Sequence, residues 1–258
     1  MMDDFLKKIR RLNWVLSEST TGTLSYEDLS RILSEITEAN FYILDNKGKV
    51  LGVSYDMAKD SSTIADVAGF EKVPLEHNQK FLEATETMAN LKGDAVSDML
   101  GQDYAQKDKL HTLIPCISGG VRQGTILLTR YDKTFTDEEI ALCEYGATVV
   151  GLEIQRNAQL EKAKERSLRM SCDMALDTLS FSEKDALTKI MDSFEEDETI
   201  LVASKVANQY KLTNSVIVNA LKKMESAGLL ETKSLGMKGT YIRILNPFLR
   251  DAVRNAKI

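Results

Sequence analysis

A helical pattern of unusual length constrains how this chain of 258 residues can fold. The pattern begins at Thr136-Asp-Glu-Glu139, a capping box in which the threonine and the glutamate satisfy each other's free amides. Apolar residues at helical spacing continue to about residue 178, with Gly146 and Gly151 as weak points. An unbroken helix over this range would be about 64 Å long, a length that joins two domains. We therefore expect one domain over residues 1–135, a connecting helix over 136–179 and a second domain over 180–258.

The second domain has the pattern of a helix-turn-helix. Ser180-Phe-Ser-Glu-Lys-Asp185 is a helix start signal. Residues 202–228 then predict a helix, a turn at Lys211-Leu-Thr213 and a second helix that ends at Gly228. Either Thr213 or Asn214 caps the second helix. Its inward positions are all apolar or small: Val216, Ile217, Ala220, Leu221 and Met224.

Two strand-like runs follow, Leu229–Lys233 and Thr240–Leu245, around a glycine-bracketed loop that carries Lys238. They predict the wing of a winged helix. Residues Thr199–Ile258 have ten basic and three acidic side chains, a net charge of +7, against −13 for the remaining 198 residues. A cationic end on an acidic chain favours binding to double-stranded DNA over a helix-turn-helix that makes only protein contacts.

The roles of these side chains toward DNA follow from their chemistry. Amides and hydroxyls at the front of the second helix suit base edges, and lysines suit phosphates. Val218 either contacts a thymine methyl or belongs partly to the core. The predicted DNA-binding residues are Ser204, Lys205, Thr213, Asn214, Ser215, Val218, Asn219, Lys222, Lys223 and Lys238.

Helices and hairpins alternate in the first domain. Helical spacing covers residues 3–18, the stretch after Ser25 and a piece around 74–82, whereas 56–109 is otherwise polar and weakly periodic. β-rich runs flank Asn46-Lys-Gly48, and Leu110–Ser118 and Gly124–Tyr131 flank residues 119–123. This order predicts an α+β fold with an antiparallel, sensor-like sheet. Gly119–Thr125 is glycine-rich but lacks the ending of a P-loop, so we expect a hairpin turn there.

Composition and spacing argue against several classes of function. Hydrophobic residues make up 43% and charged residues 28%, which is typical of a globular chain. Cys116, Cys143 and Cys172 fit neither a disulfide framework nor a zinc motif, and we expect buried free thiols. His77 and His111 are isolated, and the acidic run at 195–198 favours an exposed loop over a metal site. We therefore expect no metal, no cofactor and no catalytic residues.

The apolar runs are shorter than a membrane span, and the amino terminus lacks the apolar stretch of a secretion signal. We accordingly expect a cytoplasmic protein that does not bind a membrane.

Five motifs carry a resemblance to a known family: Leu201-Val-Ala-Ser-Lys205, Ser215-Val-Ile-Val-Asn-Ala-Leu221, Glu225-Ser-Ala-Gly228, Ser234-Leu-Gly-Met-Lys-Gly-Thr-Tyr-Ile242 and Glu144-Tyr-Gly-Ala-Thr-Val-Val-Gly151. They resemble the CodY family, the global nutrient-responsive transcriptional repressors of low-GC Gram-positive bacteria. The likeness extends over essentially the whole chain, strongly from about residue 110 and weakly over about 56–109. The chain departs from the family at Asn214, where family members carry arginine.

The resemblance implies an amino-terminal GAF domain that senses branched-chain amino acids, chiefly isoleucine, and a response to GTP. Both ligands would raise the affinity for AT-rich palindromes. The implied amino-acid-binding positions are Thr63, Ile64, Val67, Val73 and Pro74. Thr63 replaces the family's carboxylate-binding arginine, so the carboxylate would be met by backbone amides, by another base such as Lys59 or Lys92, or not at all. The apolar residues of this set either line the pocket or belong to the ordinary hydrophobic core.

The implied GTP-binding positions are Asp45, Lys47, Lys49, His77, Glu153 and Arg156, of which Asp45 and His77 depart from the family. The leading prediction is a dimeric, or tetrameric, ligand-regulated repressor of nutrient-limitation genes. The charged middle of the long helix fits either a solvated linker or pairing with a second copy. Alternatives are a winged-helix regulator that responds only to a nucleotide, and a nucleotide hydrolase with a DNA anchor.

Overall fold

The computed structural model describes residues 2–18, 25–56, 64–65, 71–102, 104, 106, 108–131 and 133–256. The chain divides into two compact units, residues 1–159 and 160–258. Helix α5, Asp137–Asp177, begins in the first unit and ends in the second. The long helix predicted from the sequence is confirmed, while the exact three-part division stays a prediction. Among the described residues, no helix is both long and apolar enough to cross a bilayer.

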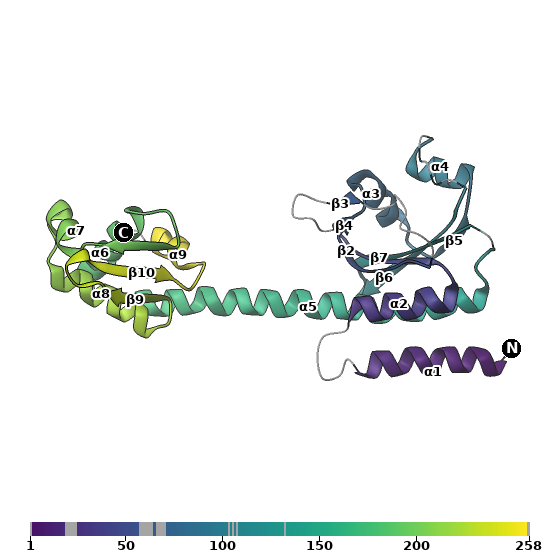
Figure 1. Ribbon diagram of the computed structural model, residues 1–258, viewed down its shortest axis with the longest axis horizontal. Helices are drawn as coiled ribbons and strands as arrows, with labels where there is room; N and C mark the ends of the chain where they lie inside the picture. The colour runs from purple at the N-terminus through teal and green to yellow at the C-terminus, as the bar shows by residue number, and fades with distance from the viewer. Residues whose placement is uncertain are drawn as a thin grey trace. The chain divides into compact units, whose positions relative to one another are not determined.

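The first unit is built on a five-stranded antiparallel sheet with the strand order β2-β1-β7-β6-β5 (Figure 1). Both predicted hairpins are present. The second turn is tighter than predicted, because its second strand begins at Val121 rather than Gly124 and leaves only Gly119 and Gly120 in the turn, both with positive φ. The strands are β1 Asn40–Asp45, β2 Val50–Ser54, β5 Met88–Leu91, β6 Leu110–Ser118 and β7 Val121–Arg130.

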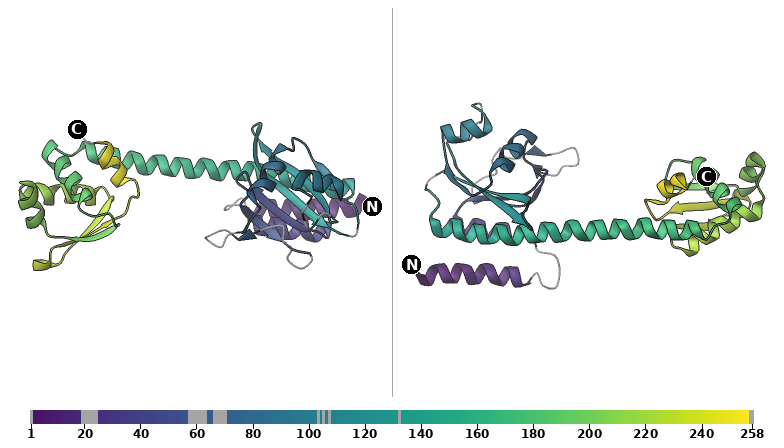
Figure 2. Two further views of the ribbon diagram at one scale, coloured as in Figure 1. Left: turned by 90° about the horizontal axis from the view of Figure 1, so that it is seen from above. Right: turned by 180° about the vertical axis from the view of Figure 1, so that it is seen from behind.

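Helices cover both faces of this sheet, α2 and α5 on one and α3 and α4 on the other (Figures 1 and 2). Successive strand side chains point to opposite faces. Phe41 and Ile43 therefore join the core under α2 and α5, whereas Tyr42 and Leu44 join the core under α3. The sequence predicted α1, α2 and α3 but not α4 or β5. The helices of this unit are α1 Met2–Glu18, α2 Tyr26–Thr37, α3 Leu75–Glu83 and α4 Asp94–Leu100, with a short hairpin of β3 Ile64–Ala65 and β4 Glu71–Lys72.

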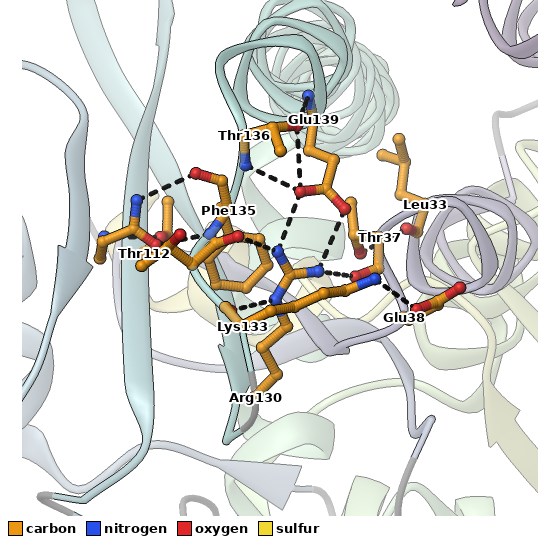
Figure 3. Close-up of polar contacts among 11 residues, drawn as sticks. Leu33, Thr37, Glu38, Thr112, Arg130, Lys133, Phe135, Thr136 and Glu139 are labelled. Carbon is orange, nitrogen blue, oxygen red and sulfur yellow. Dashed lines mark hydrogen bonds and ion pairs between the residues drawn. The ribbon is translucent and has the colours of Figure 1, made fainter. Parts of the chain in front are cut away.

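A buried ion pair fastens the first turn of α5 to the end of β7 (Figure 3). Arg130 Nη2 lies 2.9 Å from Glu139 Oε2, and their side chains are 4% and 12% exposed. The Arg130 guanidinium also donates to the carbonyls of Thr37, Lys133 and Thr134. Glu139 Oε2 accepts the Thr136 amide at 2.8 Å, and Thr136 Oγ1 accepts the Glu139 amide at 3.3 Å, so the predicted capping box is confirmed.

The second unit packs helices against a three-stranded antiparallel sheet of order β8-β10-β9. The sequence predicted the wing strands, β9 Leu230–Ser234 and β10 Thr240–Ile244, but not β8, Glu198–Leu201. The acidic run at 195–198 is exposed as predicted, although its last residue begins β8. The remaining elements are α6 Phe181–Asp192, α7 Ala203–Tyr210, α8 Asn214–Ser226, the 3₁₀ turn Gly236–Lys238 and α9 Leu249–Asn255.

Candidate nucleic-acid interface and sensor domain

Helices α7 and α8 form the predicted helix-turn-helix. Lys211 closes α7 with left-handed backbone at φ 55°, and the Leu212 amide donates to the Ala207 carbonyl at 2.9 Å. Thr213 is the N-cap of α8, which decides between the two predicted caps, and its hydroxyl lies 3.2 Å from that of Ser215. Gly228 follows the helix with φ +70°, the conformation expected where a helix ends at glycine.

Helix α8 has one buried face and one exposed polar face. Ile217, Ala220, Leu221 and Met224 are buried, and Val216 packs against the same core while partly exposed. The opposite face is exposed at Asn214, Ser215, Val218, Asn219 and Lys222. Val218 is 39% exposed, an unusual position for a core valine. Every residue predicted to read bases on this helix is thus accessible to a partner.

The wing is a tight hairpin. The Leu235 amide donates to the Gly239 carbonyl at 2.8 Å, and the 3₁₀ turn between them leaves Met237 and Lys238 exposed. Gly239 has φ +111°, and a Cβ there would lie 2.5 Å from the Leu201 carbonyl oxygen. Glycine is therefore needed where β10 begins beside β8.

The remaining predicted contacts of this unit differ in their surroundings. Ser204 and Lys205, in the first turn of α7, are exposed. Lys223 is half-buried, and its ammonium contacts Glu183 Oε2 at 2.8 Å and the Thr178 carbonyl at 3.0 Å. The phosphate contact predicted for Lys223 stays a prediction, and these protein partners, about 40 residues earlier in the chain, have no local signal in the sequence.

Not all of the positive charge in this unit faces outward. Arg250 donates to the carbonyls of Met191 and Phe194 at 3.0 and 2.7 Å, and its guanidinium lies 4.6 Å from the centre of the Phe194 ring. Arg243 pairs with Glu198 at 3.3 Å on the sheet. The net charge of +7 over residues 199–258 therefore overstates the charge that this segment can present to a polyanion.

The residues implied for amino-acid binding are only partly within the described chain. Thr63 and Val67, together with Lys59, lie outside the described residues, as does the side chain of Ile64. Val73 is 2% exposed in the core under α3, and Pro74 is the N-cap of α3. Lys92 is exposed between β5 and α4.

The residues implied for nucleotide binding fall into two groups. Asp45, Lys47 and Lys49 share the β1–β2 turn, where Asp45 Oδ1 accepts the amides of both lysines at 2.8 and 2.9 Å. This turn contacts the segment before His77, because the Val73 amide donates to the Gly48 carbonyl at 2.9 Å. Glu153 and Arg156 lie on α5, paired with each other at 2.7 Å. His77 on α3 and the pair on α5 belong to helices that cover opposite faces of the sheet.

The two histidines meet at one tyrosine, which the sequence did not predict. His77 and His111 make edge contacts with the Tyr104 ring at 5.4 and 5.7 Å between ring centres. His111 is fully buried, and one ring nitrogen lies 3.2 Å from the Tyr104 hydroxyl. Burial lowers the pKa of His77 below its usual value, which favours the neutral imidazole.

The cysteines are buried free thiols, as expected. Burial raises the pKa of Cys116 to about 12, so this thiol is unreactive at neutral pH. Among the described residues, no group of three or more histidine, cysteine or acidic side chains is arranged to hold a metal ion.

A sheet domain covered by helices on both faces, a long helix and a winged helix-turn-helix with an exposed polar reading face define a class: DNA-binding transcriptional regulators with an attached sensor domain. Comparison with known proteins specifies this class further. The profile of the CodY GAF-like domain matches residues 4–178, and that of the CodY helix-turn-helix domain matches residues 197–257.

Full-length relatives give the same result. The chain is 42% identical to a global transcriptional regulator CodY of Clostridium botulinum over 259 residues, covering 99% of this chain and 100% of the relative. It is 44% identical to that of a Thermoanaerobacter species over 257 residues, with the same coverage. The solved cofactor-binding GAF domain of the nutrient sensor CodY from Clostridium difficile is 35% identical, covers 58% of this chain and 97% of its own, and has a TM-score of 0.48.

The chain belongs to the CodY family. Its relatives are named transcriptional regulators and its second unit is a DNA-binding helix-turn-helix domain, so its role is regulatory and not enzymatic.

Proposed function

We propose that the chain is a global repressor that places α8 in the major groove of an AT-rich palindromic operator. The observation that carries this proposal is the exposed polar face of α8 beside the cationic wing. Asn214, Ser215 and Asn219 read base edges, and the exposed methyls of Val218 contact a thymine methyl. A palindromic site requires two copies related by a twofold axis, so the active form is a homodimer or a dimer of dimers in the cytoplasm.

Phosphate contacts come from Lys205, Lys222 and Lys238, with the hydroxyls of Ser204 and Thr213 beside them. These side chains are exposed on the first turn of α7, on α8 and on the wing. In this arrangement they would hold the reading helix in register while carrying no sequence information themselves.

The double variant Lys222→Ala, Lys238→Ala tests this interface. Each phosphate contact contributes about 0.9 to the slope of log K against log salt, so the slope should fall by about two units per protomer. The matched control is Lys162→Ala, Lys164→Ala, which removes the same charge from exposed positions of α5. Titrations of a labelled operator at several potassium chloride concentrations measure the slope, and an unchanged slope in the first variant rules out these contacts.

For the sensor domain we propose isoleucine, or another branched-chain amino acid, and GTP as effectors. Pro74 is partly exposed at the start of α3 and offers apolar surface that suits a branched side chain, with Val73 buried in the core beside it. Lys47 and Lys49 are exposed on the β1–β2 turn, where two cations suit a phosphate chain, and Arg156 supplies a third cation from α5. Thr63, Ile64 and Val67 complete the proposed amino-acid site, with Asp45, His77 and Glu153 in the proposed nucleotide site.

Calorimetric titration of the full chain with isoleucine, valine and GTP separates the candidate effectors. The proposal expects heat of binding from isoleucine and from GTP, and loss of GTP binding alone in a Lys47→Ala, Lys49→Ala variant. Thr63 offers no cation to the ligand carboxylate, so the titration with isoleucine is the stricter test of the proposed effectors. Binding of GTP without either amino acid would favour the regulator that responds only to a nucleotide.

A further inference from the structure

Lys223 differs in exposure and in hydrogen-bond partners from the other lysines that are predicted to contact DNA. Lys222, the residue before it on α8, is exposed, as are Lys205 on α7 and Lys238 on the wing. The Lys223 side chain is 41% exposed and turns toward α6, where its ammonium pairs with Glu183 Oε2 at 2.8 Å. The side chain of Glu183 is only 10% exposed.

The partners of Lys223 form the junction where the long helix ends and α6 begins. Its ammonium also donates to the carbonyl of Thr178, directly after α5, at 3.0 Å. Glu183 is at the same time the third residue of α6, where its carboxylate accepts the Ser180 amide at 2.8 Å in a capping box. One ammonium thus connects the reading helix to the end of α5 and to the start of α6.

A second attachment lies on the side of the wing. Asn246, 3% exposed just after β10, donates from Nδ2 to the Leu168 carbonyl of α5 at 2.9 Å and lies 3.1 Å from the Ser171 hydroxyl. The backbone amide of Asn246 donates to the Leu229 carbonyl, in the connection between α8 and β9. Both DNA-facing elements are therefore hydrogen-bonded to the last turns of the long helix or to its end.

We propose that Lys223 is a positioning residue, which holds α8 at the end of the long helix, and not a contact to the DNA phosphates. A carboxylate and a carbonyl take two of the three N–H groups of this ammonium and direct it toward α6, so that moving it to a phosphate would weaken these charge-assisted hydrogen bonds. Loss of the Lys223 ammonium changes the position of α8, whereas loss of the Lys222 ammonium removes a charge from the DNA interface. The proposal rests on DNA binding by the helix-turn-helix domain.

Salt dependence separates the two roles in the full chain. In Lys222→Met the slope of log K against log salt falls by about one unit per protomer, which also establishes that the interface is intact. In Lys223→Met the proposal expects an operator affinity that is about threefold to tenfold lower at every salt concentration, the size expected when one interacting pair is lost. The slope of log K against log salt should stay at the wild-type value. A slope reduced in Lys223→Met as much as in Lys222→Met overturns the proposal.

For Glu183→Gln, the positioning role and the change in net charge predict opposite effects on DNA affinity. Glutamine retains the capping box with Ser180 but loses the charge that holds Lys223. Removing an acidic group from a DNA-binding domain should by charge alone strengthen binding. The positioning role predicts weaker binding instead, and an affinity that equals or exceeds the wild-type value contradicts it.

The double variant Lys223→Met, Glu183→Gln completes a thermodynamic cycle. Because both changes break one connection, the double variant should bind operator no more weakly than Lys223→Met alone. Additive losses contradict the proposal. Circular dichroism melting of each variant verifies that the domain is folded, and Lys223→Arg, which keeps the pairing charge, should restore most of the affinity.

Discussion

At the scale of single residues, the Arg130–Glu139 pair illustrates when a buried charge is tolerated. The guanidinium has five N–H groups, and the structure gives partners to all of them: the carbonyls of Thr37, Lys133 and Thr134 and both oxygens of Glu139. The Phe135 ring lies 3.9 Å from the guanidinium and covers it (Figure 3). Desolvation is offset only by this complete set of partners.

Truncating Arg130 to methionine should therefore destabilise the first unit. Leaving the Glu139 carboxylate buried without its partner costs about 3 kcal/mol of unfolding free energy. Lys133→Met is the matched control, because its ion pair with Glu38 is exposed and its loss should leave stability nearly unchanged. Urea unfolding followed by the fluorescence of Trp14, the single tryptophan, measures both, and equal losses in the two variants would contradict this account.

The same pair predicts a pH dependence. Burial raises the pKa of Glu139, but hydrogen bonds from the Arg130 guanidinium and from Thr136 outweigh burial and hold the pKa below its usual value. A carboxyl group with a lowered folded pKa stabilises the protein above its unfolded pKa of about 4.3, and this stabilisation is lost as the pH falls through the folded value. The stability difference between wild type and Glu139→Gln should thus be largest near neutral pH and shrink below about pH 4. A difference that grows on acidification has the wrong sign.

Sequence reasoning at this scale succeeded where the signal is periodic. A spacing of 3.6 residues placed Asn214, Ser215, Asn219 and Lys222 on an exposed face, which the structure has. The same spacing predicted an outward Lys223, whose phosphate contact stays a prediction. The sequence could not show that Lys223 contacts Thr178 and Glu183, because only the tertiary fold brings these residues near.

At the scale of elements, the structure shows why α5 contains the two glycines that the sequence marked as weak points. A Cβ on Gly146 would lie 2.9 Å from Leu33 Cδ1, and one on Gly151 would lie 3.0 Å from the Ile117 carbonyl oxygen. Both glycines therefore mark close approach of α5 to α2 and β6 rather than breaks in the helix. Helix pattern alone cannot separate these two meanings, because it contains no information about the neighbouring element.

Gly151→Ala should accordingly destabilise the first unit, although alanine is the better helix former by about 1 kcal/mol. The neighbouring Ile117 atoms belong to backbone of the sheet and cannot move aside easily, so overpacking outweighs propensity and the net loss is about 1 kcal/mol. Gly146→Ala meets only the end of a leucine side chain and should lose less. The Trp14 urea assay compares the two variants, and a stabilised Gly151→Ala would show that α5 does not pack this closely.

The two strands that sequence reasoning missed in the larger sheets share a physical cause. The short strands β8 and β5 have too few residues for a period to be recognised, and each exists because a longer strand beside it offers free hydrogen-bonding groups. The predicted helices, the central hairpins and the wing carry local signals in caps, turns and alternation. The proposed ligand positions around residue 63 carry no such signal, and several lie outside the described residues.

At the scale of the whole molecule, one helix contributes to a hydrophobic core in each of the two units. Leu142, Cys143, Ala147 and Val150 of α5 are buried in the first unit. Cys172, Ala175 and Leu176 of the same helix are buried in the second. The same helix also contains the Leu168 carbonyl and the Ser171 hydroxyl that lie within hydrogen-bond distance of Asn246. If the protein has two arrangements that differ in DNA affinity, an effector whose binding free energy differs by about 1.4 kcal/mol between them is enough to change DNA affinity tenfold.

The central claim is that ligands of the first unit control DNA binding by the second. The most direct measurement is the dissociation constant of the full chain for a labelled AT-rich palindrome, by fluorescence anisotropy, with and without saturating isoleucine and GTP. The account predicts that the effectors together lower this constant by about tenfold, within the range typical of allosteric coupling. A dissociation constant that does not change when calorimetry shows both ligands bound, or the absence of duplex binding even at low salt, would contradict it.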